Sequence, residues 1–355
     1  MKLGKLEIRI KSHCFAGLFL IILLTVALLR TDQNDVILEE QDSRVEEKRI
    51  ARNVERKTGV SSDDSVSRCN LFSGRWVFDD VAYPLYDEKK CSFMTNEFAC
   101  EKYGRKELKY QNWRWQPHQC DLPRFNGSAF MEKIRGKRVV FVGDSLNRNQ
   151  WISMLCLIES SLRKSSPKDV VQNDNLLVFQ AIVRQFIFVN IFKSNGDSPV
   201  FHRVKDRVIR IKSIEKHARH WTDADILIFN SFTWWLQPNM TIFGESWNGE
   251  NCYNVTEPIS KQDYWGIETD ADMMHIAEST IRKLEKQGLK VEYLNITHLS
   301  DYRKDAHPSI YKEFLPPPNE EQLSNPKSYS DCVHWCLPGV PDVWNQIIYD
   351  YIIKS

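Results

Sequence analysis

Apolar runs and amphipathic stretches alternate along the C-terminal two-thirds of this chain. Short runs rich in β-branched and aromatic residues predict buried strands at 138–142, 186–192, 225–230 and 290–296. Apolar residues at helical spacing predict helices at 146–158, 213–221, 269–287 and 343–353. Gly288 is the predicted C-cap of the third of these helices. Such an alternation is typical of an α/β fold, with a parallel sheet between two layers of helices.

The N-terminus has the pattern of a membrane anchor. Residues 14–29 carry no charge, basic residues precede them, and acidic residues dominate the sequence after Arg30. The basic flank stays in the cytoplasm, so we expect a cytoplasmic tail at 1–12, a transmembrane signal anchor at 13–30 and a flexible stem at 31–68. A cleaved signal peptide is the alternative, but no small-residue cleavage site follows the apolar run.

The cysteines agree with a luminal location for the rest of this single-pass type II protein. Cys14 falls in the anchor, and an even number remains for a disulfide framework in an oxidising compartment. The eight are Cys69, Cys91, Cys100, Cys120, Cys156, Cys252, Cys332 and Cys336. Spacing does not fix their connectivity, but we expect Cys332 or Cys336 to pair with a cysteine N-terminal to the sheet.

Four N-glycosylation acceptors also fit a secretory glycoprotein. They are Asn126, Asn239, Asn254 and Asn295. The formal net charge of +1 argues against a nucleic-acid partner. The sequence says nothing about an oligomeric state.

Residues 69–120 differ from the main domain at 121–355. They hold four of the cysteines and little helical periodicity, which predicts a small Cys/Trp-rich, disulfide-held subdomain. The cluster from Tyr110 through Trp113 and Trp115 mixes aromatic faces with amide and guanidinium groups. It would suit sugar rings, or else anchor the core of the subdomain.

Ser145 follows the strand at 138–142 through the turn Gly143-Asp144-Ser145. A glycine permits a sharp turn, and the start of a helix supplies free backbone N–H groups that stabilise an oxyanion. The turn therefore marks Ser145 as a candidate nucleophile at the carboxyl end of a strand, where ligands bind in open α/β sheets. Alone, the tripeptide is weak evidence for a nucleophile, because an ordinary turn has the same sequence.

Asp331 and His334 supply the other two roles. At this spacing the carboxylate can reach one imidazole nitrogen while the other nitrogen faces outward, so that His334 activates Ser145. A metal site at Cys332, His334 and Cys336 is the alternative, and it fails if all eight cysteines are paired. Asn230, at the end of another strand, is a candidate oxyanion donor or a turn residue, and Arg148 is a second oxyanion or substrate candidate.

With these residues placed, the chain resembles the plant trichome birefringence-like family, whose catalytic part is the PC-esterase branch of the SGNH/GDSL hydrolase fold. The matching motifs are CNLFSGRWV at 69–77, YQNWRWQP at 110–117, GDS followed by RNQ at 143–150, and DCVHWCLPG at 331–339. The resemblance extends from about Cys69 to the C-terminus. Family members usually carry a longer and more aromatic segment at 179–199, where this chain has Lys193 in place of an acidic residue.

The resemblance implies O-acetylation of cell-wall polysaccharides in the Golgi through an acetyl-serine intermediate, with Ser145 as nucleophile, His334 as base and Asp331 as its partner. Acetyl-CoA or another acetyl carrier would be the co-substrate, without a bound cofactor or metal. The stretch 295–311 is most similar to members that act on xylan. A carbohydrate acetylesterase and a non-catalytic wall-polymer binder remain as alternatives, the latter because of the altered segment at 179–199.

Overall fold

The computed structural model describes residues 69–161, 169–173, 176–180, 185–190, 215, 218–219, 221–231, 251–261, 264–266 and 271–355. The predicted tail, anchor and stem lie outside these residues, as do Asn239, Lys193 and most of the predicted helix at 213–221. In the part of the chain that is described, no helix has the length and apolar character needed to cross a bilayer. Residues 69–355 form one compact unit.

A five-stranded sheet holds the predicted central strands. The sheet order is β4-β5-β6-β3-β7, and β3 (Arg138–Gly143) pairs in parallel with β6 (Gln185–Asn190) and β7 (Ile226–Asn230). These three strands and their parallel pairing confirm the prediction. The other two strands, β4 (Asp169–Asn173) and β5 (Leu176–Gln180), pair antiparallel and were not predicted.

The predicted strand at 290–296 is wrong, because these residues form no strand in the structure. The apolar side chains of Leu294 and Ile296 nevertheless pack against the hydrophobic core. Apolar alternation reports burial of side chains, whereas a strand also needs a backbone partner.

Side chains of β3 alternate between the two faces of the sheet. Val139 and Phe141 face a core formed with α2 (Gly127–Lys133), α3 (Ser145–Ser161) and α9 (Val340–Lys354). On the other face, the core includes Val140, Val142 and Trp221 and is flanked by Ala218. Strand β3 is thus buried on both sides, which accounts for its continuous apolar sequence.

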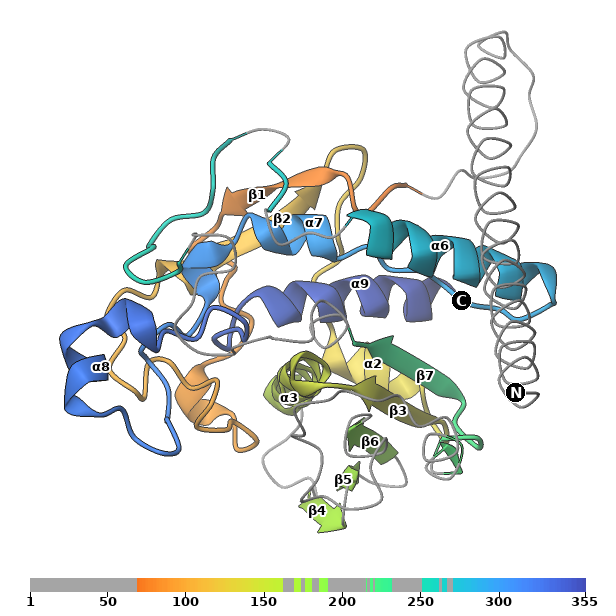
Figure 1. Ribbon diagram of the computed structural model, residues 1–355. Coiled ribbons are helices and arrows are strands. Elements are labelled where there is room, and N and C mark those ends of the chain that lie inside the picture. Colours follow the sequence, from red (N-terminus) through yellow and green to blue (C-terminus); the bar gives the residue numbers. More distant parts are fainter. Residues whose placement is uncertain are drawn as a thin grey trace, which may run out of the picture. The chain divides into compact units, whose positions relative to one another are not determined.

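Helix α9 lies between the five-stranded sheet and residues 69–120, which we call the N-terminal segment (Figure 1). Ile348 and Tyr349 belong to the same core as Val139 and Phe141 of the sheet. Trp344 and Ile347 belong to a second core, which includes Trp115. The helix was predicted at 343–353 and begins earlier, with Pro341 in its first turn. Because both cores share one helix, residues 69–120 pack as part of the same unit as the sheet.

The N-terminal segment contains a two-stranded antiparallel sheet. It joins β1 (Gly74–Phe78) to β2 (Trp113–Pro117), with the Trp76 and Trp115 rings edge to face at 5.6 Å. Tyr110 and Trp115 are buried, so these two side chains anchor the core and are not free to stack on a sugar. The core-anchor interpretation therefore holds for them.

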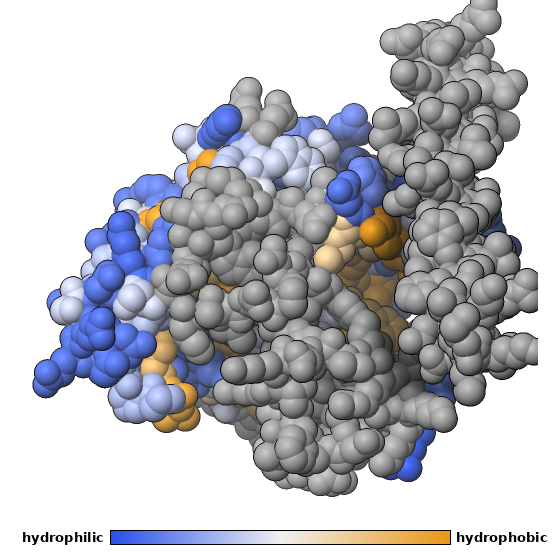
Figure 2. Space-filling view, viewed as in Figure 1, coloured by the Kyte–Doolittle hydropathy of each residue, from blue (hydrophilic) through white to orange (hydrophobic). Residues whose placement is uncertain are grey.

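Shorter elements complete the described fold. The long helix α6 (Ala271–Lys286) ends as predicted at Gly288, whose φ of 90° is the left-handed value of a glycine C-cap. The others are η1 (Glu88–Lys90), η2 (Lys109–Asn112), α7 (Thr297–Asp301), η6 (Lys304–Ala306), α8 (Glu320–Ser324) and η7 (Pro326–Ser328). Figure 2 shows that the surface around α8 is mostly hydrophilic.

All eight predicted cysteines form disulfides. The pairs are Cys69–Cys120, Cys91–Cys156, Cys100–Cys336 and Cys252–Cys332. The Cys100–Cys336 bond confirms that a C-terminal cysteine pairs with one preceding the sheet. Two of the bonds hold the segment that carries Asp331 and His334, which lies outside any long helix or strand.

Candidate active site

Ser145 is the first residue of α3 and directly follows the turn after β3. The Asp144 carboxylate caps the helix by accepting a hydrogen bond from the Leu146 N–H at 2.9 Å. Burial raises the pKa of Asp144 to about 6, against the lowering effect of the Leu146 and Asn147 N–H groups. The turn before Ser145 therefore joins a buried strand to a largely buried helix, with Asp144 as the helix cap.

Position 143 has no room for a side chain, so only glycine fits there. A Cβ at this position would lie 2.0 Å from the Asn230 carbonyl oxygen and 2.5 Å from the Asn147 Cβ. Gly143 is not among the glycines with positive φ, so the conformational freedom expected from the sequence is not its role. The close approach of β7 explains the glycine.

Ser145, His334 and Asp331 form a continuous hydrogen-bonded chain. His334 Nε2 lies 2.8 Å from Ser145 Oγ, and His334 Nδ1 lies 2.8 Å from Asp331 Oδ2. Asp331 is fully buried, whereas the His334 side chain is 14% exposed. The structure therefore brings together a serine and a histidine that are 189 positions apart, with the aspartate in the role predicted from its chemistry.

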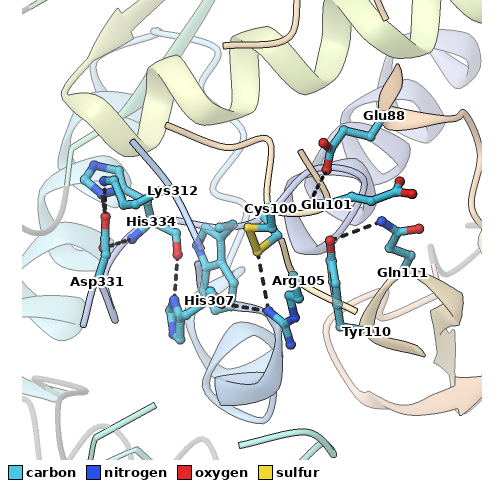
Figure 3. The surroundings of a disulfide bond; sticks show 12 residues. Glu88, Cys100, Glu101, Arg105, Tyr110, Gln111, His307, Lys312, Asp331 and His334 are labelled. Atoms are coloured by element: carbon cyan, nitrogen blue, oxygen red, sulfur yellow. Dashed lines mark hydrogen bonds and ion pairs between the residues drawn. A yellow bond between two sulfur atoms is a disulfide. The ribbon is translucent and has the colours of Figure 1, made fainter. Parts of the chain in front are cut away.

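Four donors surround the Asp331 carboxylate. Oδ1 accepts the N–H groups of Val333 and His334, both at 3.0 Å. Oδ2 accepts from His334 and from the ammonium group of Lys312, and both side chains meet the carboxylate in Figure 3. Burial opposes ionisation, but the charges and hydrogen bonds of His334 and Lys312 hold the pKa of Asp331 well below its usual range.

Two buried contacts fix the backbone beside His334. Asn149, on α3, accepts the Trp335 N–H at 2.8 Å and donates to the Trp335 carbonyl at 3.2 Å. His307 Nδ1 lies 2.7 Å from the His334 carbonyl oxygen, and its ring stacks on Trp335 at 4.0 Å. Burial lowers the pKa of His307 to about 4, so its ring is neutral at physiological pH. A neutral ring with a proton on Nδ1 can donate to this carbonyl.

Arg148 lies on α3, three residues after Ser145. Its guanidinium forms an ion pair with Glu97 and lies 5.3 Å from the centre of the Phe98 ring. Phe98 also contacts the His334 ring, with centroids 5.9 Å apart. Burial lowers the pKa of Arg148 to about 10, which leaves it cationic at neutral pH.

Asn230 lies beside Gly143 in the register of β3 and β7. Its side-chain amide donates to Gln150 Oε1 at 3.2 Å, and its carbonyl accepts the Asp144 N–H at 3.4 Å. These contacts place Asn230 at the turn. Its use as an oxyanion donor, and the substrate role of Arg148, stay predictions.

The alternative metal site lacks its sulfur ligands. Cys332 and Cys336 are both bonded in disulfides, so neither can supply a thiolate to a metal. Within the described ranges, no cluster of three His, Cys, Asp or Glu residues is suited to hold a metal ion.

Several residues of the site were not identified from sequence. Asn149 lies within the motif at 143–150 and His307 within the stretch 295–311, but nothing in either sequence pattern indicated which groups they bond. Glu97, Phe98 and Lys312 carried no local signal, because their contacts depend on how the N-terminal segment and the loop before Asp331 pack.

An α/β sheet with a serine at a strand-to-helix turn, linked through histidine to a buried aspartate, is the arrangement of acyl-transfer enzymes that act through serine. Known sequences agree with this class. Residues 122–246 and 242–351 match PC-Esterase, described as a GDSL/SGNH-like acyl-esterase family found in Pmr5 and Cas1p, and residues 67–121 match the PMR5 N-terminal domain.

Individual relatives cover most of the chain. Protein trichome birefringence-like 34 of Arabidopsis thaliana is 42% identical, over 82% of this chain and 86% of its own length. Xylan O-acetyltransferase 13 of Oryza sativa subsp. japonica is 39% identical, over 91% of this chain and 78% of its own. This chain therefore belongs to the trichome birefringence-like proteins of the PC-esterase family.

Proposed function

We propose that this protein is a polysaccharide O-acetyltransferase that moves an acetyl group to hydroxyls of xylan through an acetyl-serine at Ser145. The hydrogen-bonded chain from Ser145 through His334 to Asp331 is the observation that carries the proposal. The acceptor is inferred from similar proteins that are named xylan O-acetyltransferases.

In the first half of the reaction, His334 Nε2 takes the proton from Ser145 Oγ as this oxygen attacks the acetyl carbonyl carbon of the donor. The bond between the acetyl group and its carrier breaks, and the carrier leaves with the proton from His334. Asp331 keeps the imidazole in the tautomer that has its free lone pair on Nε2 and stabilises the imidazolium.

In the second half, a sugar hydroxyl gives its proton to His334 and attacks the acetyl carbon. The bond to Ser145 Oγ breaks, and Oγ takes the proton back from His334. Arg148, with its positive charge beside Phe98, is a candidate to bind the donor or the acceptor. Acetyl-CoA or another acetyl carrier serves as co-substrate.

The decisive experiment incubates purified full-length protein with an acetyl donor and xylan oligosaccharides and weighs the products. We expect oligosaccharides heavier by one or more acetyl groups, and an acetyl adduct on Ser145 when acceptor is withheld. Ser145→Ala should give neither. Free acetate without acetylated sugar would indicate the esterase, and neither product, with xylan still bound, would indicate the non-catalytic binder.

We place the protein in the Golgi membrane as a single-pass type II protein with its catalytic domain in the lumen. Four disulfides and the exposed sequon residues Asn126 and Asn254 support an oxidising, glycosylating compartment. Glycosidase digestion of the protein from its native membrane should increase its gel mobility. An unchanged band, together with free thiols at all eight cysteines from Cys69 onward, would exclude this topology.

A further inference from the structure

Lys312 is a buried cation whose position is set by the loop that precedes Asp331. Ser309 and Asp331 form an isolated antiparallel bridge, in which each N–H donates to the other's carbonyl at 2.9 Å. Three residues beyond Ser309, the Lys312 side chain is only 8% exposed and its ammonium bonds Asp331 Oδ2. No pattern in the sequence indicates this pairing.

The shared oxygen makes the contact chemically informative. Asp331 Oδ2 accepts from both Lys312 Nζ and His334 Nδ1 (Figure 3). In a site with aspartate alone, the whole negative charge stabilises the imidazolium formed during catalysis. Here a positive charge lies on the same carboxylate, so it opposes protonation of the imidazole.

We propose that Lys312 is a positioning residue of this site, which holds the Asp331 carboxylate in place and makes His334 a weaker base than aspartate alone would make it. The inference rests on the proposed role of Ser145 and His334 in acyl transfer, but it does not depend on the identity of the acceptor. Its consequence is that acetylation of Ser145 reaches half of its full rate at a lower pH than it would without Lys312.

Other charged groups near His334 do not account for the same effect. His307 is neutral, because burial lowers its pKa to about 4. Burial raises the pKa of Asp144 to about 6, so this group titrates between pH 5 and 9. Asp144 is present in wild type and in every variant at Lys312, so its effect on the rate is common to all of them. Arg148 lies over the Phe98 ring, which contacts the His334 ring, and its charge is paired with Glu97. A comparison of variants therefore isolates Lys312.

The test measures the rate at which full-length protein is acetylated by p-nitrophenyl acetate between pH 5 and 9. Lys312→Met should move the midpoint of the rising limb upward by about one pH unit or more. Lys312→Arg, which keeps the charge, should stay close to wild type. The control Lys327→Met removes an exposed lysine four residues before Asp331 and should leave the midpoint unchanged.

A second neutral variant guards against misfolding. Lys312→Gln keeps a donor for Asp331 without the charge, and its midpoint should move in the same direction as that of Lys312→Met. Unchanged midpoints in folded neutral variants, with or without a lower rate, would overturn the inference and leave the proposed function intact. If wild type reacts no faster than Ser145→Ala, the proposed function itself fails.

Discussion

At the scale of single residues, the turn before Ser145 depends on the absence of one side chain. The carbonyl oxygen of Asn230 and the side chain of Asn147 occupy the space that a Cβ on Gly143 would need. Both neighbours are held in place, Asn230 by the ladder to β3 and Asn147 by its position in α3. Neither can move away without displacing Ser145.

We therefore expect Gly143→Ala to lower the free energy of unfolding by about 1–3 kcal/mol, the usual cost of overpacking. The fraction of folded Gly143→Ala protein that a fluorophosphonate labels at Ser145 should be lower than the fraction of folded wild type that it labels. Gly136→Ala is the control, because Gly136 has a φ of 73° and a Cβ there would meet no atom within 4 Å, so alanine strains the backbone without a steric clash. Equal labelling of the two folded variants would contradict the steric interpretation.

Asn149 is a second residue whose replacement tests the site. It is fully buried, and its amide bonds both polar groups of the Trp335 backbone next to His334. Asn149→Ala removes both bonds, and we expect the acetylation rate to fall about a hundredfold, because an ångström of misplacement at a reacting group has such an effect. The rate is measured on protein that circular dichroism shows to be folded, and a rate within about threefold of wild type would remove Asn149 from the site.

At the scale of elements, two disulfides constrain the segment of Asp331 and His334 from its two ends. Cys332 directly follows Asp331, and Cys336 lies two residues after His334. Because this segment lacks regular hydrogen-bonded structure, covalent links replace the rigidity that a helix or strand would supply. The remaining two bonds, including Cys69–Cys120, lie elsewhere in the sequence.

Removal of Cys100–Cys336 by a double alanine substitution should therefore reduce activity more than removal of Cys69–Cys120. We expect each to reduce stability by about 2–5 kcal/mol, as is usual for a native disulfide. The distinguishing measurement is the acetylation rate per folded molecule at a temperature where both variants are folded. Equal rates would show that the bond supports the fold without holding His334.

How far the sequence predicted these elements depended on how local their determinants were. Strand β3, the start of α3 and the C-cap at Gly288 are encoded by neighbouring residues, and all three were predicted. The sequence also singled out Ser145, Asp331 and His334 as candidates by residue type and spacing, and the structure brings the three side chains into one hydrogen-bonded chain. It failed at 290–296, where burial arises from packing rather than from a ladder.

Contacts between distant segments could not be predicted, because their determinants are not local in the sequence. The bonds from Asn149 to Trp335 join residues 186 positions apart, and the bond from Lys312 to Asp331 depends on the bridge at Ser309. The spacing of apolar residues along the sequence does not indicate which distant residues pair. The antiparallel strands β4 and β5 likewise depend on their pairing with β6.

At the scale of the whole molecule, a buried carboxyl group joins the N-terminal segment to both central helices. Asp342, in the first turn of α9, accepts hydrogen bonds from Tyr86 at 3.0 Å, from Ser153 of α3 at 2.5 Å and from the Gly339 N–H at 2.8 Å. Burial raises the pKa of Asp342 to about 7 despite these bonds, which favour the ionised form. The group therefore retains a proton in the folded protein at pH values where the unfolded chain has lost it.

This difference predicts how global stability changes with pH. Between the unfolded pKa of about 4 and the folded pKa of about 7, the folded state binds more protons, so Asp342 contributes a loss of stability as pH rises, with little further change above about pH 8. Asp342→Asn cannot ionise, and its amide can still accept the Gly339 N–H while donating to Ser153 or Tyr86. We expect its melting temperature, relative to wild type, to rise steadily from pH 5 to pH 8.

The control for this prediction is Asp80→Asn, which removes an exposed carboxyl group. Its melting temperature should differ from that of wild type by the same amount at every pH. Differential scanning calorimetry on the three proteins across this range makes the comparison, and Asp144 influences all three equally. A constant difference between Asp342→Asn and wild type would mean that Asp342 is already ionised in the folded protein at pH 5. In that case its three donors outweigh the effect of burial, and the junction between the N-terminal segment and the central helices is insensitive to pH.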